Sequence, residues 1–177
     1  LRYVLCSIAP EAKDSEFTWK DFQSRNNNEL ADIFGNFVNR VLVLSNKYFN
    51  GIVPEKGQLE DVDKKVLGEM RLVKDRIDAK IEEFKFRESL AEAMNLARLG
   101  NKYFADTEPW KLIKTDEGRV ATVMNIAIQI AANLSIAFEP FLPFSTERLR
   151  KMMRLPAVEW SVLGTANIVK DRHQLGS

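Results

Sequence analysis

The sequence has a single cysteine and a single histidine among its 177 residues. Cys6 alone cannot form an internal disulfide bond or a zinc site with several thiolates, and its isolation favours a reducing, cytoplasmic compartment. His173 has no second histidine with which to build a metal pair, and the eight glycines contain no phosphate-binding loop. Carboxylates are plentiful, but they occupy ordinary amphipathic faces such as "EDVDKK" at residues 60–65. We therefore expect no catalytic residues and no metal site in this chain.

An excess of charge of one sign is also missing, since 26 Lys and Arg face 25 Asp and Glu and the net charge is +1. Proteins that bind nucleic acid mainly through phosphates usually have a basic excess, so any such binding here should depend on local geometry. The longest apolar run, residues 120–138, is interrupted by Asn125, Gln129 and Asn133. This run predicts a buried helix and no membrane span.

Apolar residues recur with a helical period along almost the whole chain, which predicts an all-α fold of about five main helices, a short C-terminal helix and a coil tail. We expect one domain over residues 1–177, in which the coil tail covers 160–177. The expected helices are 1–9, ended by Pro10; 18–49, capped by Thr18 and stopped at Asn50-Gly51; 62–84; 86–104; 116–138; and 146–153, capped by Ser145.

A polar stripe runs along the helix predicted for residues 18–49. At 100° per residue, Glu29, Asn36, Arg40, Val43 and Lys47 cluster away from the apolar face. Asn36 and Arg40 are four residues apart, so their side chains can converge on one small object. Such a stripe is either a solvated face or a surface on which an amide and a guanidinium bind a base edge.

Trp110 follows the predicted end of a helix, in the segment "YFADTEPWKLIK". Pro109 precedes it and biases Glu108 out of the helical conformation, while Lys111 and Lys114 follow. A tryptophan in this place is either part of the core or a platform on which an unpaired base stacks.

Three blocks, in this order, resemble the helical anticodon-binding domain of methionyl-tRNA synthetase: "NNNELADIFGNFVNRVLVLSNKYFNGIVP", "LGNKYFADTEPWKL" and "EPFLPFSTERLRKMM". The similarity extends from "LRYVL" to "HQLG". It implies the anticodon-binding helical bundle of class I aminoacyl-tRNA synthetases, and it implies that Asn36, Arg40 and Trp110 contact the CAU anticodon. Pro109, Lys47 and Lys111 are expected to support those contacts.

The family's catalytic half, with its "HIGH" and "KMSKS" signatures and zinc-binding cysteines, is absent from this sequence. The resemblance therefore implies that ATP and zinc belong to that half and that this chain carries no cofactor. We expect residues 1–10 to begin the domain that follows it, within a longer, cytoplasmic methionine–tRNA ligase. The expected partners are the anticodon loop of tRNA(Met), the catalytic half of the same protein, and a second copy bound through a further C-terminal domain; no membrane is expected.

An apolar patch is expected where the catalytic half would attach, formed by Leu1, Tyr3, Val4, Leu5 and Ile8, with the coil tail returning to the same end. Two alternatives stay open. The chain is the anticodon-binding domain of a synthetase for isoleucine, valine, leucine or cysteine, or it is a helical protein-interaction module with a solvated stripe and a buried Trp110.

Overall fold

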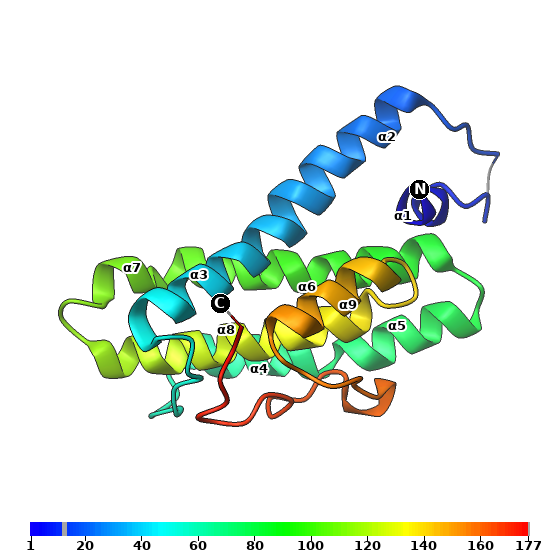
Figure 1. Ribbon diagram of the computed structural model, residues 1–177. Coiled ribbons are helices and arrows are strands. Elements are labelled where there is room, and N and C mark those ends of the chain that lie inside the picture. The colour runs from blue at the N-terminus through cyan, green and yellow to red at the C-terminus, as the bar shows by residue number, and fades with distance from the viewer. Residues whose placement is uncertain (12–13, 177) are drawn as a thin grey trace.

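A computed structural model describes residues 1–11 and 14–176, and within them the chain is mainly helical (Figure 1). The elements are α1 (Arg2–Ser7), α2 (Trp19–Arg25), η1 (Asn26–Gly35), α3 (Asn36–Phe49), α4 (Asp61–Arg71), α5 (Val73–Glu82), α6 (Phe86–Thr107), α7 (Pro109–Leu112), α8 (Glu117–Ala137), α9 (Pro143–Met152) and η2 (Trp160–Val162). The all-α prediction is confirmed. The helices outnumber the five predicted because predicted helices are divided and α7 was not expected.

The helix predicted from Thr18 to Phe49 is a continuous helical rod made of α2, η1 and α3, which rises from the bundle at an angle in Figure 1. The Thr18 hydroxyl oxygen accepts a hydrogen bond of 3.1 Å from the Asp21 backbone N–H, so the predicted cap is present. At the other end Asn50 adopts a left-handed conformation, with φ at 52°, and ends α3 as predicted.

The middle of the rod, η1, is a π-helix. Its hydrogen bonds reach the fifth residue along the chain, so it turns through less than 100° per residue and the α-helical phase is not kept across it. Glu29 consequently does not share a face with Asn36 and Arg40. It accepts a hydrogen bond from the Tyr3 hydroxyl and pairs with Arg25 at 3.4 Å. The predicted stripe is therefore wrong at Glu29 and holds only within α3.

The helix predicted over residues 62–84 is two helices, α4 and α5, divided at Leu72. Leu72 has ψ at −11°, which tightens the backbone for one residue without changing the apolar spacing. Periodicity cannot detect a break of this kind. The C-terminal coil passes close to it, because a Cβ atom on Gly164 would lie 3.1 Å from the carbonyl oxygens of Met70 and Arg71.

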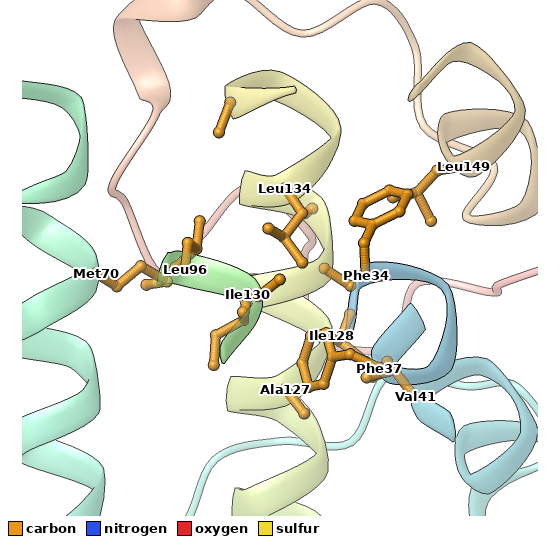
Figure 2. Close-up of a cluster of buried hydrophobic side chains, with 14 of the residues drawn as sticks. Phe34, Phe37, Val41, Met70, Leu96, Ala127, Ile128, Ile130, Leu134 and Leu149 are labelled. Atoms are coloured by element: carbon orange, nitrogen blue, oxygen red, sulfur yellow. The ribbon is translucent and has the colours of Figure 1, made fainter. Parts of the chain in front are cut away.

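The centre of the bundle is α8, as predicted (Figures 1 and 2). Asp116 caps it by accepting a hydrogen bond of 2.8 Å from the Arg119 backbone N–H. Its most apolar window has a mean hydropathy of 1.6 and is long enough to cross a membrane, yet 94% of that window is buried inside the protein. Figure 2 shows Ile128, Ile130 and Leu134 of α8 among apolar side chains from the rod, α4, α6 and α9.

Three amides of α8 attach the C-terminal coil. Asn125 donates to the Asp171 carboxylate (2.8 Å), and Gln129 exchanges hydrogen bonds with the backbone of Val169 (2.7 and 3.1 Å). Asn133 donates to the Thr165 carbonyl oxygen (2.8 Å). The residues that interrupt the apolar run are thus spaced by one turn along the line where the coil lies. These bonds satisfy the buried amide groups, except for the Asn125 Oδ1 atom, which has no partner among the described residues.

Two predictions about the C-terminal part are wrong. The helix α9 begins at Pro143 and not after Ser145, because the fixed φ of proline suits the first helical position. The coil tail does not return to α1. It runs to the end of α3, where the Leu175 N–H donates to the Gly51 carbonyl (2.8 Å).

The apolar patch predicted at the start of the chain is only partly present. Leu1 and Leu5 are 71% and 50% exposed and line an open cavity of about 430 Å³ with Phe86. Tyr3 and Val4, in contrast, are buried in the main core. The face of α1 that carries these two residues packs inward, so only its opposite face remains open.

Candidate nucleic-acid interface

Arg40 of α3 lies against aromatic rings from two other elements. Its Cζ atom is 4.8 Å from the centroid of the Trp110 ring and 5.3 Å from the centroid of the Phe104 ring. Both distances are within the range of cation–π attraction. The Trp110 side chain remains 37% exposed. Two of the three predicted anticodon contacts, which are far apart in the sequence, are therefore neighbours on an open surface.

Trp110 follows the end of a helix, as predicted, and it lies in α7, a single helical turn between α6 and α8. Glu108 ends α6 in a left-handed conformation, with φ at 40°, and its N–H donates to the Phe104 carbonyl at 2.9 Å. Pro109 then occupies the first position of α7, where its missing N–H costs no hydrogen bond. Because Pro109 is buried, it anchors the start of α7 to the bundle and so fixes the position of the neighbouring Trp110.

The position of Arg40 depends on a close contact between α3 and α6. The Phe37 ring is fully buried and lies 5.5 Å from the Phe104 ring, centroid to centroid. It can approach α6 because Gly100 has no side chain: a Cβ atom there would lie only 2.5 Å from the Phe37 ring. Arg40 lies almost one turn after Phe37 on α3, so this contact determines which part of α6 Arg40 lies beside.

The other residues predicted to contact RNA differ in whether their side chains already have a partner within the protein. Asn36 is exposed one turn before Arg40, and its side chain makes no hydrogen bond to any residue in the described part of the chain. Lys47 is exposed at the far end of α3, with its Nζ atom 5.6 Å from the Tyr48 ring centroid. Lys111 is paired with Glu108 at 2.7 Å. Asn36, Arg40 and Lys47 can therefore meet a ligand directly, whereas Lys111 would first have to leave its partner.

A buried ionic cluster of Asp63, Tyr103 and Arg119 supports the same end of the bundle. Arg119 donates two hydrogen bonds to the Asp63 carboxylate (2.6 and 2.9 Å), and the Tyr103 hydroxyl donates a third (2.6 Å). Burial opposes ionisation of Asp63, but the bonds from Arg119 and Tyr103 outweigh it and lower the pKa of this carboxyl. Burial and the bond to Asp63 raise the pKa of Tyr103. Asp63 belongs to α4, Tyr103 to α6 and Arg119 to α8. The cluster therefore joins the helices that precede and follow α7 to each other and to α4.

The sequence did not reveal this cluster, because Asp63 was placed on an ordinary solvated face. A signal was present in "EDVD": Glu60 and Asp63 form a capping box, in which the Asp63 carboxylate accepts from the Glu60 backbone N–H at 2.9 Å. A capping carboxylate that also faces an arginine of another helix cannot be recognised from spacing along one helix.

His173 lies in the C-terminal coil, half-buried, with Nε2 at 2.8 Å from the Met153 carbonyl oxygen. No catalytic partner contacts it in the described ranges. Within residues 1–11 and 14–176, no group of three or more His, Cys, Asp or Glu side chains is arranged to hold a metal ion.

Residues 53–173 match the family described as the anticodon binding domain of methionyl tRNA ligase, and residues 1–42 match class I tRNA synthetases of the methionine type. Asn36 and Arg40 fall in the second match and Trp110 in the first. An all-helical bundle with these two matches is an anticodon-binding bundle of the class I aminoacyl-tRNA synthetases.

Within that class, the chain belongs to the family of the methionyl-tRNA ligase anticodon-binding domain. It is 61% identical over 175 residues to a methionine–tRNA ligase of Phocaeicola vulgatus and 57% identical over 178 residues to one of Porphyromonas gingivalis. It covers 99% and 100% of its own length in these matches and 26% of each relative, so it spans about a quarter of those proteins. The predicted family is confirmed, and the alternative of a synthetase for another amino acid is wrong.

The fold is also that of a solved structure. A free-state methionyl-tRNA synthetase of Mycobacterium tuberculosis superimposes with a TM-score of 0.89 over 98% of this chain and 36% of that one, at 22% sequence identity. The interaction-module alternative requires a buried Trp110, which the 37% exposure contradicts.

Proposed function

We propose that this chain recognises the CAU anticodon of tRNA(Met) on the surface formed by Asn36, Arg40 and Trp110. The observation that carries the proposal is the Arg40 guanidinium 4.8 Å above a Trp110 ring that stays 37% exposed. Anticodon loops present unstacked bases, which proteins recognise by stacking and by contacts to base edges. A near-neutral chain can bind in this way without a large basic surface.

Trp110 supplies the stacking platform. One face of the indole is taken by Arg40, so an incoming base stacks on the face that Arg40 leaves open. Stacking on an aromatic side chain is worth on the order of 1–3 kcal/mol per base and tolerates any base. Trp110 therefore provides affinity more than discrimination.

Arg40 and Asn36 supply discrimination. They lie one turn apart on α3, and both have hydrogen-bonding groups that no described residue uses. A guanidinium donates in a plane, and an amide both donates and accepts, so together they can match one base edge and reject others. By analogy with duplex recognition, a contact of two bonds discriminates by roughly 1–3 kcal/mol. Lys47, further along α3, would contact a phosphate.

The relatives bear the name methionine–tRNA ligase, and we propose that this chain serves the same activity as the tRNA-recognising part of such a ligase. Joining methionine to tRNA would then take place in a catalytic half outside this chain, with ATP and zinc there. We further propose a cytoplasmic location, and a homodimer formed through another domain.

A hairpin titration tests the anticodon proposal. The chain should bind an RNA hairpin with a CAU loop more tightly than the same hairpin with a GAU loop. The Trp110→Ala variant should lose roughly 1–3 kcal/mol of CAU affinity while keeping its helical circular dichroism, since stacking and not core packing is removed. Trp19→Ala is the matched control, because Trp19 is 76% exposed on α2 and lies outside the surface. Equal affinity for both loops, or equal losses in both variants, would refute the proposal.

A further inference from the structure

A second open site lies away from Trp110, in the angle between α1, the rod and α6. It is a cleft of about 230 Å³ whose charged and polar lining includes Tyr3, Arg25, Glu29, Arg87 and Arg98. Three of these five side chains are arginines. The chain as a whole has almost no net charge, so this concentration of guanidinium groups is local.

The two walls of the cleft differ in charge. On the rod, Arg25 is neutralised by Asp21 at 2.8 Å and by Glu29 at 3.4 Å. On α6, Arg87 and Arg98 are exposed, and neither forms an ion pair with any residue in the ranges that the structure describes. The Arg98 guanidinium makes one hydrogen bond, to the Asn95 amide oxygen at 2.9 Å. The Glu11 carboxylate accepts a hydrogen bond from the Arg87 backbone N–H (2.7 Å), but it is not paired with the Arg87 guanidinium. The α6 wall therefore carries two guanidinium groups that form no ion pair with a described residue.

Arg87 and Arg98 point along the same line of α6. They are separated by about three helical turns, and between them the exposed Ala91 offers only a methyl group, so a ligand can come close to the helix there. At a rise of about 1.5 Å per residue, Arg98 is roughly 14 Å and Arg87 roughly 30 Å from the end of α6 at Thr107. Trp110 lies just beyond that end.

We propose that Arg87 and Arg98 bind phosphodiester groups of the tRNA strand that leads away from the anticodon. The inference rests on the proposed function, because binding of the anticodon at Trp110 determines where the adjoining RNA strand lies. Two guanidinium groups three turns apart are placed for successive contacts with an extended polyanion and not for one small anion. Arginine also forms paired, charge-assisted hydrogen bonds with phosphate oxygens. An acidic segment of a protein is the competing ligand.

The test compares two hairpins with the same CAU loop, one with a stem as long as α6 and one with a stem cut to a few base pairs. Affinity is measured over a series of salt concentrations for the wild-type chain, the double variant Arg87→Gln/Arg98→Gln and the charge-preserving variant Arg87→Lys/Arg98→Lys. The matched control is Lys65→Gln/Arg71→Gln, which removes the same charge from exposed positions of α4. α4 and the rod lie on opposite sides of α6 in Figure 1.

The glutamine variant should weaken binding of the long-stem hairpin and reduce the slope of log K against log salt by roughly 0.7–0.9 for each lost phosphate contact. Binding of the short-stem hairpin should not change, and the lysine variant should keep most of the slope. A glutamine variant that behaves like the α4 control, or that weakens both hairpins equally, overturns the inference while the anticodon proposal stands. Failure of the wild-type chain to prefer CAU overturns both. Loss of binding to a polyglutamate peptide with unchanged RNA binding assigns the cleft to protein and also overturns the inference.

Discussion

At the scale of single residues, Arg40 can use two parts of its side chain at once. The face of its guanidinium lies on the Trp110 and Phe104 rings. Its N–H groups point outward in the plane of the group, where they can donate to a base edge. Stacking fixes the plane before any ligand arrives, so less rotamer freedom is lost on binding.

A lysine in place of Arg40 separates charge from shape. Arg40→Lys keeps the positive charge but loses the planar set of donors, so we expect CAU affinity to fall little and the preference of CAU over GAU to fall by roughly 1–3 kcal/mol. Arg40→Ala should lose both. Parallel titrations with the two hairpins measure the effect, and Arg148→Lys on the exposed side of α9 should change neither value. Full discrimination by the Arg40→Lys variant would show that Arg40 acts only as a charge.

At the scale of elements, the apolar periodicity predicted which face of each helix is buried. It did not predict where the helical repeat itself changes. The centre position of α8 follows from its nearly continuous apolar sequence, and the ends of the rod follow from Thr18 and Asn50. The π-helical turns of η1 left no mark in the composition, so Glu29 was assigned to the wrong face. The docking of the coil on Asn133 depends on residues distant in the sequence, which spacing along one helix cannot reveal.

In the candidate site, too, one part could be predicted from the sequence and another part could not. The separation of Asn36 and Arg40 is local to one helix and was predicted. Trp110 was identified from its place after Pro109 as either core or a stacking platform, and the resemblance to a known family favoured the platform. That Arg40 reaches Trp110 depends on how closely α3 approaches α6. This approach is set by the Gly100 contact with Phe37, which no pattern within either helix encodes.

Replacing Gly100 tests whether the contact between α3 and α6 positions Arg40. A Cβ atom at Gly100 would lie 2.5 Å from the buried Phe37 ring, so Gly100→Ala should push the helices apart and cost about 1–3 kcal/mol of the free energy of unfolding. The shift should also weaken CAU hairpin binding, although residue 100 is buried and touches no ligand. Urea unfolding and hairpin titration measure the two effects.

Gly68→Ala is the control for helix propensity. A Cβ atom at Gly68 of α4 would meet nothing within 4 Å, so this change should stabilise the protein by up to about 1 kcal/mol and leave RNA binding unchanged. Destabilisation by Gly100→Ala with unchanged hairpin binding would mean that Arg40 does not depend on the spacing of α3 and α6.

At the scale of the whole molecule, α6 connects the features argued to act on RNA. Its C-terminal end leads into α7 and Trp110, and the cleft wall that it forms carries Arg87 near its start and Arg98 just past its middle. Tyr103, close to the C-terminal end, ties α6 to Asp63 and Arg119, and so to α4 and α8. The Asp63 cluster therefore fixes the corner from which Trp110 projects, and it is the most deeply buried ionic group described here.

Replacing the Asp63 carboxylate with an amide should reveal this role in the pH dependence of the free energy of unfolding. Asp63→Asn removes one partner of a buried pair and leaves Arg119, only 10% exposed, without its main carboxylate, which should cost about 3–5 kcal/mol at pH 7. Because the folded pKa of Asp63 is lowered, its contribution is complete above the ordinary carboxyl pKa of about 4 and is lost as pH falls through the lower, folded value. The difference in unfolding free energy between wild type and variant should thus shrink on acidification below about pH 4.

Asp61→Asn provides the comparison on the same helix. The Asp61 side chain is fully exposed and pairs with Lys64 at 3.2 Å, so its replacement should change stability by no more than about 1 kcal/mol. Urea unfolding of the three proteins between neutral and acidic pH measures both effects. If the cluster positions Trp110, Asp63→Asn should also weaken CAU hairpin binding at pH 7 under conditions where the variant is still folded, and Asp61→Asn should not. A stability difference that stays constant from pH 7 to pH 3 would mean that Asp63 does not act through its charge, and normal hairpin binding by a destabilised Asp63→Asn variant would confine the cluster to holding the fold.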